Sequence, residues 1–176
     1  MEGLINPKWS DLNIPYFIWK DNPLCSVAGI QFIEKESRIF GIKEKIVQLD
    51  GIANNIINSL ANISDGNKDN LLTDIKNKKK LLADLLIKYN EIEKKFTEED
   101  KFYREELFET YRNKYLSTSF FSFADKKIYL SSMFEIQILL KDKFDDFCEA
   151  YYNIRNDFFQ INNYIIKFKQ LINKDF

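Results

Sequence analysis

Apolar side chains recur every three or four residues in three long stretches of this chain, the spacing that places them on one face of an α-helix. The first stretch keeps the spacing for four heptads and predicts a helix over residues 31–63 with an aliphatic seam, typical of a coiled coil or bundle. Gly41 and Gly51 fall off this seam and are expected on the outer face. The seam positions are Ile39, Ile42, Ile46, Leu49, Ala53, Ile56, Leu60 and Ile63.

The second stretch predicts a helix over residues 69–116. The run Ser64–Asn67 before it is rich in turn-forming residues, and Asp69 suits a helix N-terminus as a cap or a first-turn acid. No proline or glycine follows Asn67, so nothing in the sequence interrupts the helix. Its periodic positions are Leu71, Ile75, Leu82, Leu85, Tyr89, Ile92, Phe96, Tyr103, Leu107 and Tyr111.

The third stretch has the most regular heptads and predicts a helix over residues 125–174. Serines and phenylalanines break the pattern at 116–124, where we expect a chain reversal, with Ser122 or Asp125 capping the next helix. Gln137 is the one strongly polar seam residue, a feature that often fixes register. The seam runs through Met133, Gln137, Leu140, Phe144, Phe147, Tyr151, Ile154, Phe158, Ile161, Ile165, Phe168 and Ile172.

Short connections favour antiparallel neighbours, so the predicted fold is all-α. We expect an elongated antiparallel three-helix bundle or coiled coil, running up-down-up over residues 31–176. Residues 1–30 are predicted to form an extended N-terminal arm, because all three prolines lie in the first 23 residues. The arm carries Trp9, Tyr16, Phe17 and Trp19. We expect these rings to cover the aromatic end around residues 102–130; the alternative is that they reach a neighbouring subunit.

Length and composition exclude several functional classes for this protein. The length of 176 residues suits one domain, and a net charge of −1 argues against nucleic-acid binding driven by bulk positive charge. The absence of histidine removes His-metal sites and Ser-His or Cys-His relays. Cys25 and Cys148 are far apart in sequence, so we interpret them as two buried thiols rather than a disulfide or zinc site.

Targeting features are also absent from the sequence. The N-terminus has no basic region followed by an apolar one, and no segment approaches the roughly 20 apolar residues of a membrane-spanning helix. We therefore expect a cytoplasmic protein, or one incorporated into a particle assembled in the cytoplasm.

Charged clusters are the remaining candidates for polar chemistry. Carboxylates gather at residues 98–100, at 105–106 and at 142–149. Positions near 98 and 142 should lie at similar heights on the second and third helices. Interspersed lysines indicate a solvated, salt-bridged face, and we assign no catalytic residue, cofactor or metal. The run Lys76–Lys80 is interpreted as a solvated outer face, although contact with phosphate or an acidic partner is an alternative.

The predicted reversal carries Phe120, Phe121 and Phe123. Exposed rings at such a tip can wedge into a membrane or a partner's groove, whereas the alternative is burial beneath the arm. With the four arm aromatics, these residues are the candidate partner-binding positions.

The sequence favours a non-enzymatic structural or adaptor subunit of a larger assembly, such as a phage virion, injection or secretion machine. Its expected partners are proteins, including copies of itself. An intracellular inhibitor or immunity-type protein with one partner is the alternative. A membrane-contacting helical protein using the phenylalanine tip is a more distant one, as is an enzyme.

Overall fold

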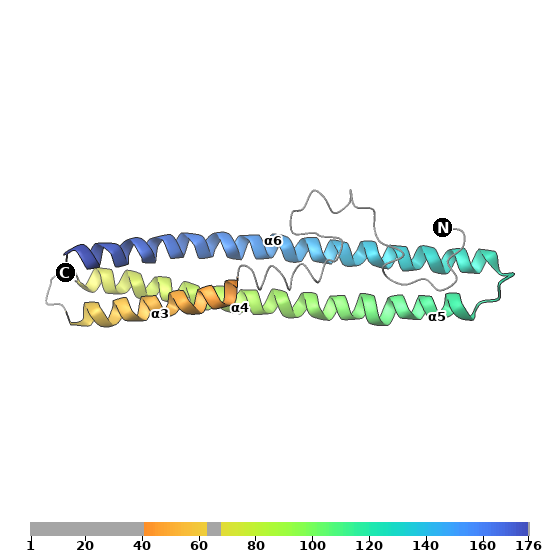
Figure 1. Ribbon diagram of the computed structural model, residues 1–176, viewed down its shortest axis with the longest axis horizontal. Helices are drawn as coiled ribbons and strands as arrows, with labels where there is room; N and C mark the ends of the chain where they lie inside the picture. The colour runs from red at the N-terminus through yellow and green to blue at the C-terminus, as the bar shows by residue number, and fades with distance from the viewer. Residues whose placement is uncertain (1–40, 63–67, 176) are drawn as a thin grey trace. The chain divides into compact units, whose positions relative to one another are not determined.

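The computed structural model describes residues 41–62 and 68–175, with side chains described as far as residue 172. Helix covers 94% of these residues, and this part of the chain contains no strand, so the predicted all-α fold is confirmed (Figure 1). The arm at 1–30 and the first ten residues of the predicted helix 31–63 lie outside the described residues. The elements are α3 (Ile42–Ala61), α4 (Lys68–Lys101), the π-helical η2 (Phe102–Phe108), α5 (Glu109–Ser117) and α6 (Phe123–Asp175).

The described residues fall into two compact units, and both α4 and α6 contribute to each of them. We call residues 41–62, 68–92 and 149–175 the three-helix unit. Residues 93–148 are the aromatic unit.

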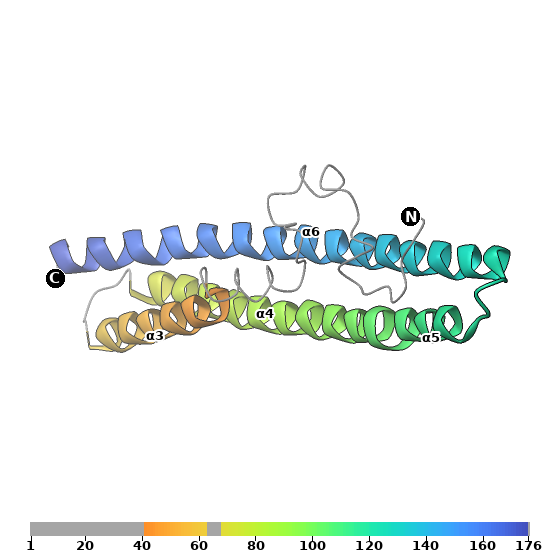
Figure 2. The ribbon, with the colours of Figure 1, turned by 45° about the vertical axis from the view of Figure 1, so that its right-hand side comes forward.

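In the three-helix unit, α3 packs beside the first part of α4 and the last part of α6 (Figures 1 and 2). Every described seam position of α3 is buried, which confirms the heptad prediction. Tyr89 of α4 meets Tyr151 of α6 edge to face, with ring centroids 6.2 Å apart. Burying one aliphatic side chain contributes about 1.5–3 kcal/mol, so this core is the main source of the unit's stability. The buried partners are Ile75, Leu82, Leu85 and Tyr89 of α4, and Tyr151, Ile154, Phe158, Ile161, Ile165 and Phe168 of α6.

Two glycines of the predicted first helix differ in their backbone. Gly41 precedes α3 and has φ +47°, in the left-handed region, so a continuous helix over 31–63 is wrong at this residue. Gly51 is helical and exposed, and a Cβ placed there would meet nothing within 4 Å. Only Gly51 therefore behaves as the predicted outer-face position.

The aromatic unit packs the end of α4, η2 and α5 against the first part of α6. Phe96 packs against both Phe144 and Phe147, with ring centroids 5.5 and 5.4 Å away. The prediction of a second, aromatic-rich core at this end is confirmed, whereas the arm's predicted share lies outside the described residues. This core joins Phe108, Tyr115, Met133 and Ile136 to the partly buried Tyr103, Leu107, Tyr111, Tyr129 and Leu130.

The segment η2 departs from the single helix predicted over 69–116. A π-helix closes its hydrogen bonds over one more residue than an α-helix, which rotates the following residues around the axis. The deepest burial accordingly falls on Phe108 and Tyr115 rather than on the predicted Leu107 and Tyr111, which are half-buried.

The turn between α5 and α6 is closed by short-range hydrogen bonds. The Thr118 hydroxyl donates to the Lys114 carbonyl at 2.6 Å, and the Ser122 amide donates to the Ser119 carbonyl at 3.0 Å. Ser122 directly precedes α6, and its backbone carbonyl accepts from the Lys126 amide at 3.1 Å. Ser122 therefore occupies the predicted capping position.

Candidate contact surfaces

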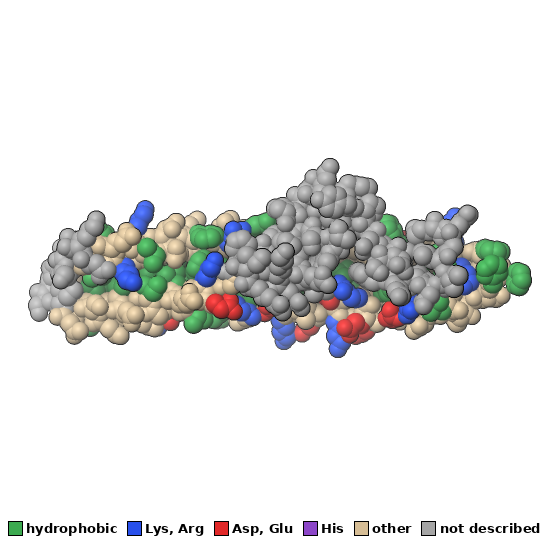
Figure 3. Space-filling view, in the orientation of Figure 1, with side chains coloured by type: hydrophobic (Ala, Val, Ile, Leu, Met, Phe, Trp, Pro, Cys, Tyr) green, Lys and Arg blue, Asp and Glu red, His purple; other side chains and the backbone are tan. Residues whose placement is uncertain are grey.

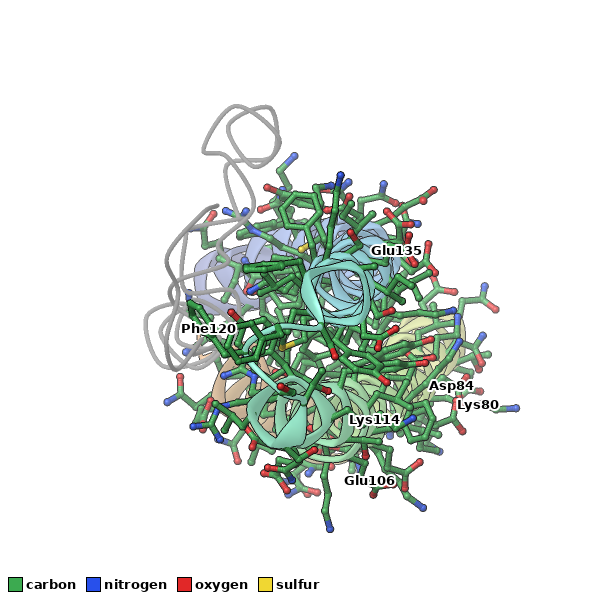
Figure 4. The ribbon with its side chains drawn as sticks, turned by 90° about the vertical axis from the view of Figure 1, so that its right-hand side faces the viewer. Lys80, Asp84, Glu106, Lys114, Phe120 and Glu135 are labelled. Carbon is green, nitrogen blue, oxygen red and sulfur yellow. The ribbon has the colours of Figure 1, made fainter. Side chains whose placement is uncertain are left out.

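The turn between α5 and α6 presents three exposed aromatic rings, which we call the phenylalanine tip. Phe120, Phe121 and Phe123 are 73%, 85% and 66% exposed. The alternative of burial beneath the arm involves residues outside the described ones, so it stays a prediction. The Phe120 ring meets the other two edge to face, with centroids 6.0 and 5.7 Å away. Apolar side chains gather at this turn in Figure 3, and Figure 4 labels Phe120 beside the helix ends.

The local fold explains this exposure. The aromatic core ends on α5 at Tyr115, and from Thr118 the chain leaves the helix with an extended backbone. The rings therefore occupy the reversal itself, beyond the residues that the two helices bury against each other. Leu116 and Ile128, exposed on either side of the turn, enlarge the apolar surface. Such a patch usually marks a contact with a protein or a membrane.

Positive charge surrounds the phenylalanine tip. Asp125 is the only acidic residue from 110 to 134, a range that contains four basic residues. Lys126 donates to the Tyr115 carbonyl at 3.0 Å, and its ammonium lies 4.3 Å from the Tyr115 ring centroid. The Lys114 ammonium lies 5.1 Å from the centroid of Tyr111. These contacts hold cations on both helices that flank the rings.

A groove of about 540 Å³ lies between α3 and α4 in the three-helix unit, and we call it the lysine groove. The Lys79 ammonium lies 3.8 Å from the Asp50 carboxylate across it. Val47 is 60% exposed and gives the groove an apolar wall. Lys80, also exposed, extends outward from α4 (Figure 4). The lining residues are Ile46, Val47, Asp50, Lys76, Lys79, Lys80, Leu82, Ala83 and Leu86.

A second groove, of about 600 Å³, lies between α4 and α6 of the same unit. The Tyr164 hydroxyl donates to the Asp74 carboxylate at 3.3 Å, and the Lys78 ammonium lies 4.9 Å from the Tyr164 ring centroid. Desolvation, followed by the nearby Asp74 charge, raises the pKa of Tyr164 above its ordinary range. The lining includes Asp84 and Asp157 as well as lysines, so this groove lacks a single sign of charge.

The predicted carboxylate clusters form ion pairs in the aromatic unit. Glu99 of α4 lies 3.9 Å from Lys143 of α6, which confirms that positions near 98 and 142 lie at similar heights. Lys141 pairs with Asp145 one turn later on the same helix. Among the described residues, no group of three or more His, Cys, Asp or Glu side chains is arranged to hold a metal ion.

One of these acids is partly desolvated. The Asp100 carboxylate lies 3.3 Å from the Arg104 guanidinium, at the junction of α4 and η2. Burial raises the pKa of Asp100, the positive charge of Arg104 opposes this rise, and Glu105 adds to it. Segment 93–109 holds seven acidic and four basic residues, and we call it the acidic segment.

Several predicted features stand outside these surfaces. Trp9, Tyr16, Phe17 and Trp19 lie outside the described residues, so their predicted role in partner binding stays a prediction. Cys148 is buried and free, as expected of it, and Cys25 is not among the described residues. In the described ranges, no helix combines the length and apolarity needed to cross a bilayer.

The lysine groove is not among the features predicted from sequence, which favours a solvated face at Lys76–Lys80. A signal was present: Lys76, Lys79, Lys80 and Ala83 are spaced three or four residues apart and so share one side of the helix. The chain matches no known family model, no curated protein and no solved structure.

Proposed function

We propose that this chain is a non-enzymatic structural or adaptor subunit of a larger protein assembly, built in the cytoplasm. The observation that carries the proposal is the lysine groove, which combines an apolar wall with lysines. A helix that exposes acidic side chains beside an apolar one is the partner that such a groove fits.

The proposed architecture is an antiparallel bundle in the three-helix unit. The order of contacts supports this direction: Lys43 approaches Tyr89, Asp50 approaches Lys79, and Lys68 donates to the Ala61 carbonyl. Residue numbers rise along α3 as they fall along α4. The Tyr89–Tyr151 and Asp74–Tyr164 contacts have the same reversed order between α4 and α6.

The proposed occupant of the lysine groove is the acidic segment of a second copy. The described ranges of the three-helix unit hold twelve basic and nine acidic residues, whereas the aromatic unit holds ten basic and twelve acidic. Opposite excess charges on two parts of one chain favour contact between unlike parts of two copies. Glu105 and Glu106 are exposed, and Glu106 projects outward in Figure 4.

An interface of this kind is head-to-tail, because it joins two different surfaces. Head-to-tail contacts build rings when they close and filaments when they do not, which suits a repeating subunit. The arm remains a further proposed contact, with Trp9 and Trp19 as anchors, since tryptophan is common at interface hot spots.

Light scattering after size exclusion, over a range of protein concentrations, tests this proposal. We expect self-association that weakens as salt is added, because solvent-exposed charge pairs are screened. The double variant K76E/K80E reverses two groove charges and is expected to be monomeric. The matched variant K167E/K169E makes the same change at exposed positions of α6 outside the groove, and it should associate like the wild type. A wild-type chain that stays monomeric at every concentration contradicts the proposal and favours the single-partner inhibitor.

A further inference from the structure

We propose that the phenylalanine tip inserts into the interface of an anionic lipid bilayer. The proposal concerns a surface on the aromatic unit and does not rest on the proposed function, whose carrying observation lies in the three-helix unit. A subunit with both surfaces would hold its assembly against a membrane.

The first argument is the length of the uncharged stretch at the turn. All ten residues from Tyr115 to Ala124 are uncharged, and they include the three exposed rings of the tip. The rings can therefore leave water without taking a charged side chain with them, which is the costly step of insertion. Exposed Leu116 and Ile128 widen the apolar surface that enters.

The second argument is that the turn satisfies part of its own backbone. The Lys114 carbonyl accepts from the Thr118 hydroxyl, and the Ser119 carbonyl accepts from the Ser122 amide. The Ser122 carbonyl accepts from the Lys126 amide at the start of α6. Because unpaired polar groups are expensive among lipid chains, these bonds lower the cost of placing the turn at the headgroup boundary.

The third argument is charge. Lys114 precedes the uncharged stretch, Lys126 and Lys127 follow it, and Asp125 is the one acid nearby. Lysines on both sides of an apolar tip match anionic headgroups above an apolar interior. Tyr111 and Tyr129, half-buried with ring centroids 6.5 Å apart, lie one level further from the tip, where interfacial aromatic residues are common.

A bilayer accounts for this arrangement better than a protein groove does. The rim of a protein groove carries polar and charged groups that complement those of its ligand. Here the charged residues that flank the uncharged stretch are Lys114, Lys126 and Lys127, with Asp125 as the one acid, and this excess of positive charge suits a uniformly anionic plane.

The test is co-flotation of the full-length chain with lipid vesicles. We expect the wild type to bind vesicles of phosphatidylcholine mixed with phosphatidylserine at least about tenfold more strongly than pure phosphatidylcholine. The variant F120S/F121S/F123S should lose at least about tenfold in binding to the mixed vesicles. The variant K114Q/K127Q should bind the mixed vesicles almost as weakly as it binds phosphatidylcholine. All three rings are exposed, so unchanged far-UV circular dichroism is expected.

The matched control is F159S, which makes the same change at an exposed phenylalanine on α6 in the three-helix unit. It should bind vesicles like the wild type. Absence of wild-type binding to mixed vesicles, or full binding by the tip variant, overturns the proposal. So does a tip variant that changes light-scattering mass but not vesicle binding, because the tip would then contact protein.

Discussion

The Lys79 ammonium of α4 lies 3.8 Å from the Asp50 carboxylate of α3, and this ion pair crosses the lysine groove. Both side chains are more than a third exposed, so the pair adds little to stability. Within the groove, the Asp50 carboxylate lies beside Lys79, whereas Lys76 and Lys80 are on the exposed side of α4. An incoming acidic helix would therefore meet these two lysines first.

The buried seam of α6 should dominate stability. Replacing Ile154 by alanine removes a fully packed side chain in the three-helix unit and should lower the free energy of unfolding by about 2–5 kcal/mol. Asp146→Ala changes an exposed residue of the same helix and should stay within about 0.5 kcal/mol of the wild type. Urea denaturation measures both. A larger loss for the aspartate variant would give that carboxylate a structural role.

Gly41, which caps α3, and Gly51, which lies within it, offer a matched pair. Gly41→Ala places a side chain at φ +47°, which costs about 1–2 kcal/mol for an L-residue. Gly51→Ala adds a methyl group into open space on a helix and should stabilise the protein by about 0.4–1 kcal/mol. Thermal unfolding should shift in opposite directions for the two variants. A shift of the same sign in both would contradict the left-handed cap at Gly41.

A feature of this fold can be predicted from the sequence when it is determined by residue spacing within one helix, and not when it depends on packing between helices. The α6 seam from Met133 to Phe168 follows from spacing alone, and all of its residues are buried as predicted. The shift from Leu107 to Phe108 follows from a π-helical turn, which no proline or glycine announces. The lysine groove forms only where α3 and α4 pack together, and the spacing of Lys76 and Lys80 within one helix does not indicate that packing.

The phenylalanine tip was predicted only in part. The sequence places its rings at a chain reversal but leaves both exposure and burial open. Spacing along a helix decides which face is buried, and it does not apply to residues in a turn. The contacts of the four arm aromatics lie outside the described residues, so their prediction is unchanged.

Asp100 should make stability depend on pH. Burial raises its folded-state pKa above the ordinary value of 3.8, so the folded state binds the proton more tightly than the unfolded state does. Stability from this group is thus fully present below pH 3.8 and is lost as pH rises through the folded-state pKa.

Asp100→Asn lacks this titration. The difference in unfolding free energy, variant minus wild type, should therefore increase as the pH rises from about 3 to about 7. Denaturation at several pH values checks the slope, and Asp146→Asn, at an exposed position, is the control. Parallel curves for Asp100→Asn and wild type would show that Arg104 fully offsets the burial.

Mixing two oppositely charged variants tests the central claim, that the lysine groove of one copy takes the acidic segment of another. K76E/K80E alters only the groove, and E105K/E106K alters only exposed residues of the acidic segment. Each variant alone should lose self-association, because its own groove and segment then carry like charges. Light scattering of an equal mixture measures whether contact returns. In the mixture, the native groove of E105K/E106K can take the native acidic segment of K76E/K80E. The acidic groove of K76E/K80E can in turn take the basic segment of E105K/E106K. We therefore predict a mass above that of either variant alone. A mixture that scatters as two monomers would contradict the account.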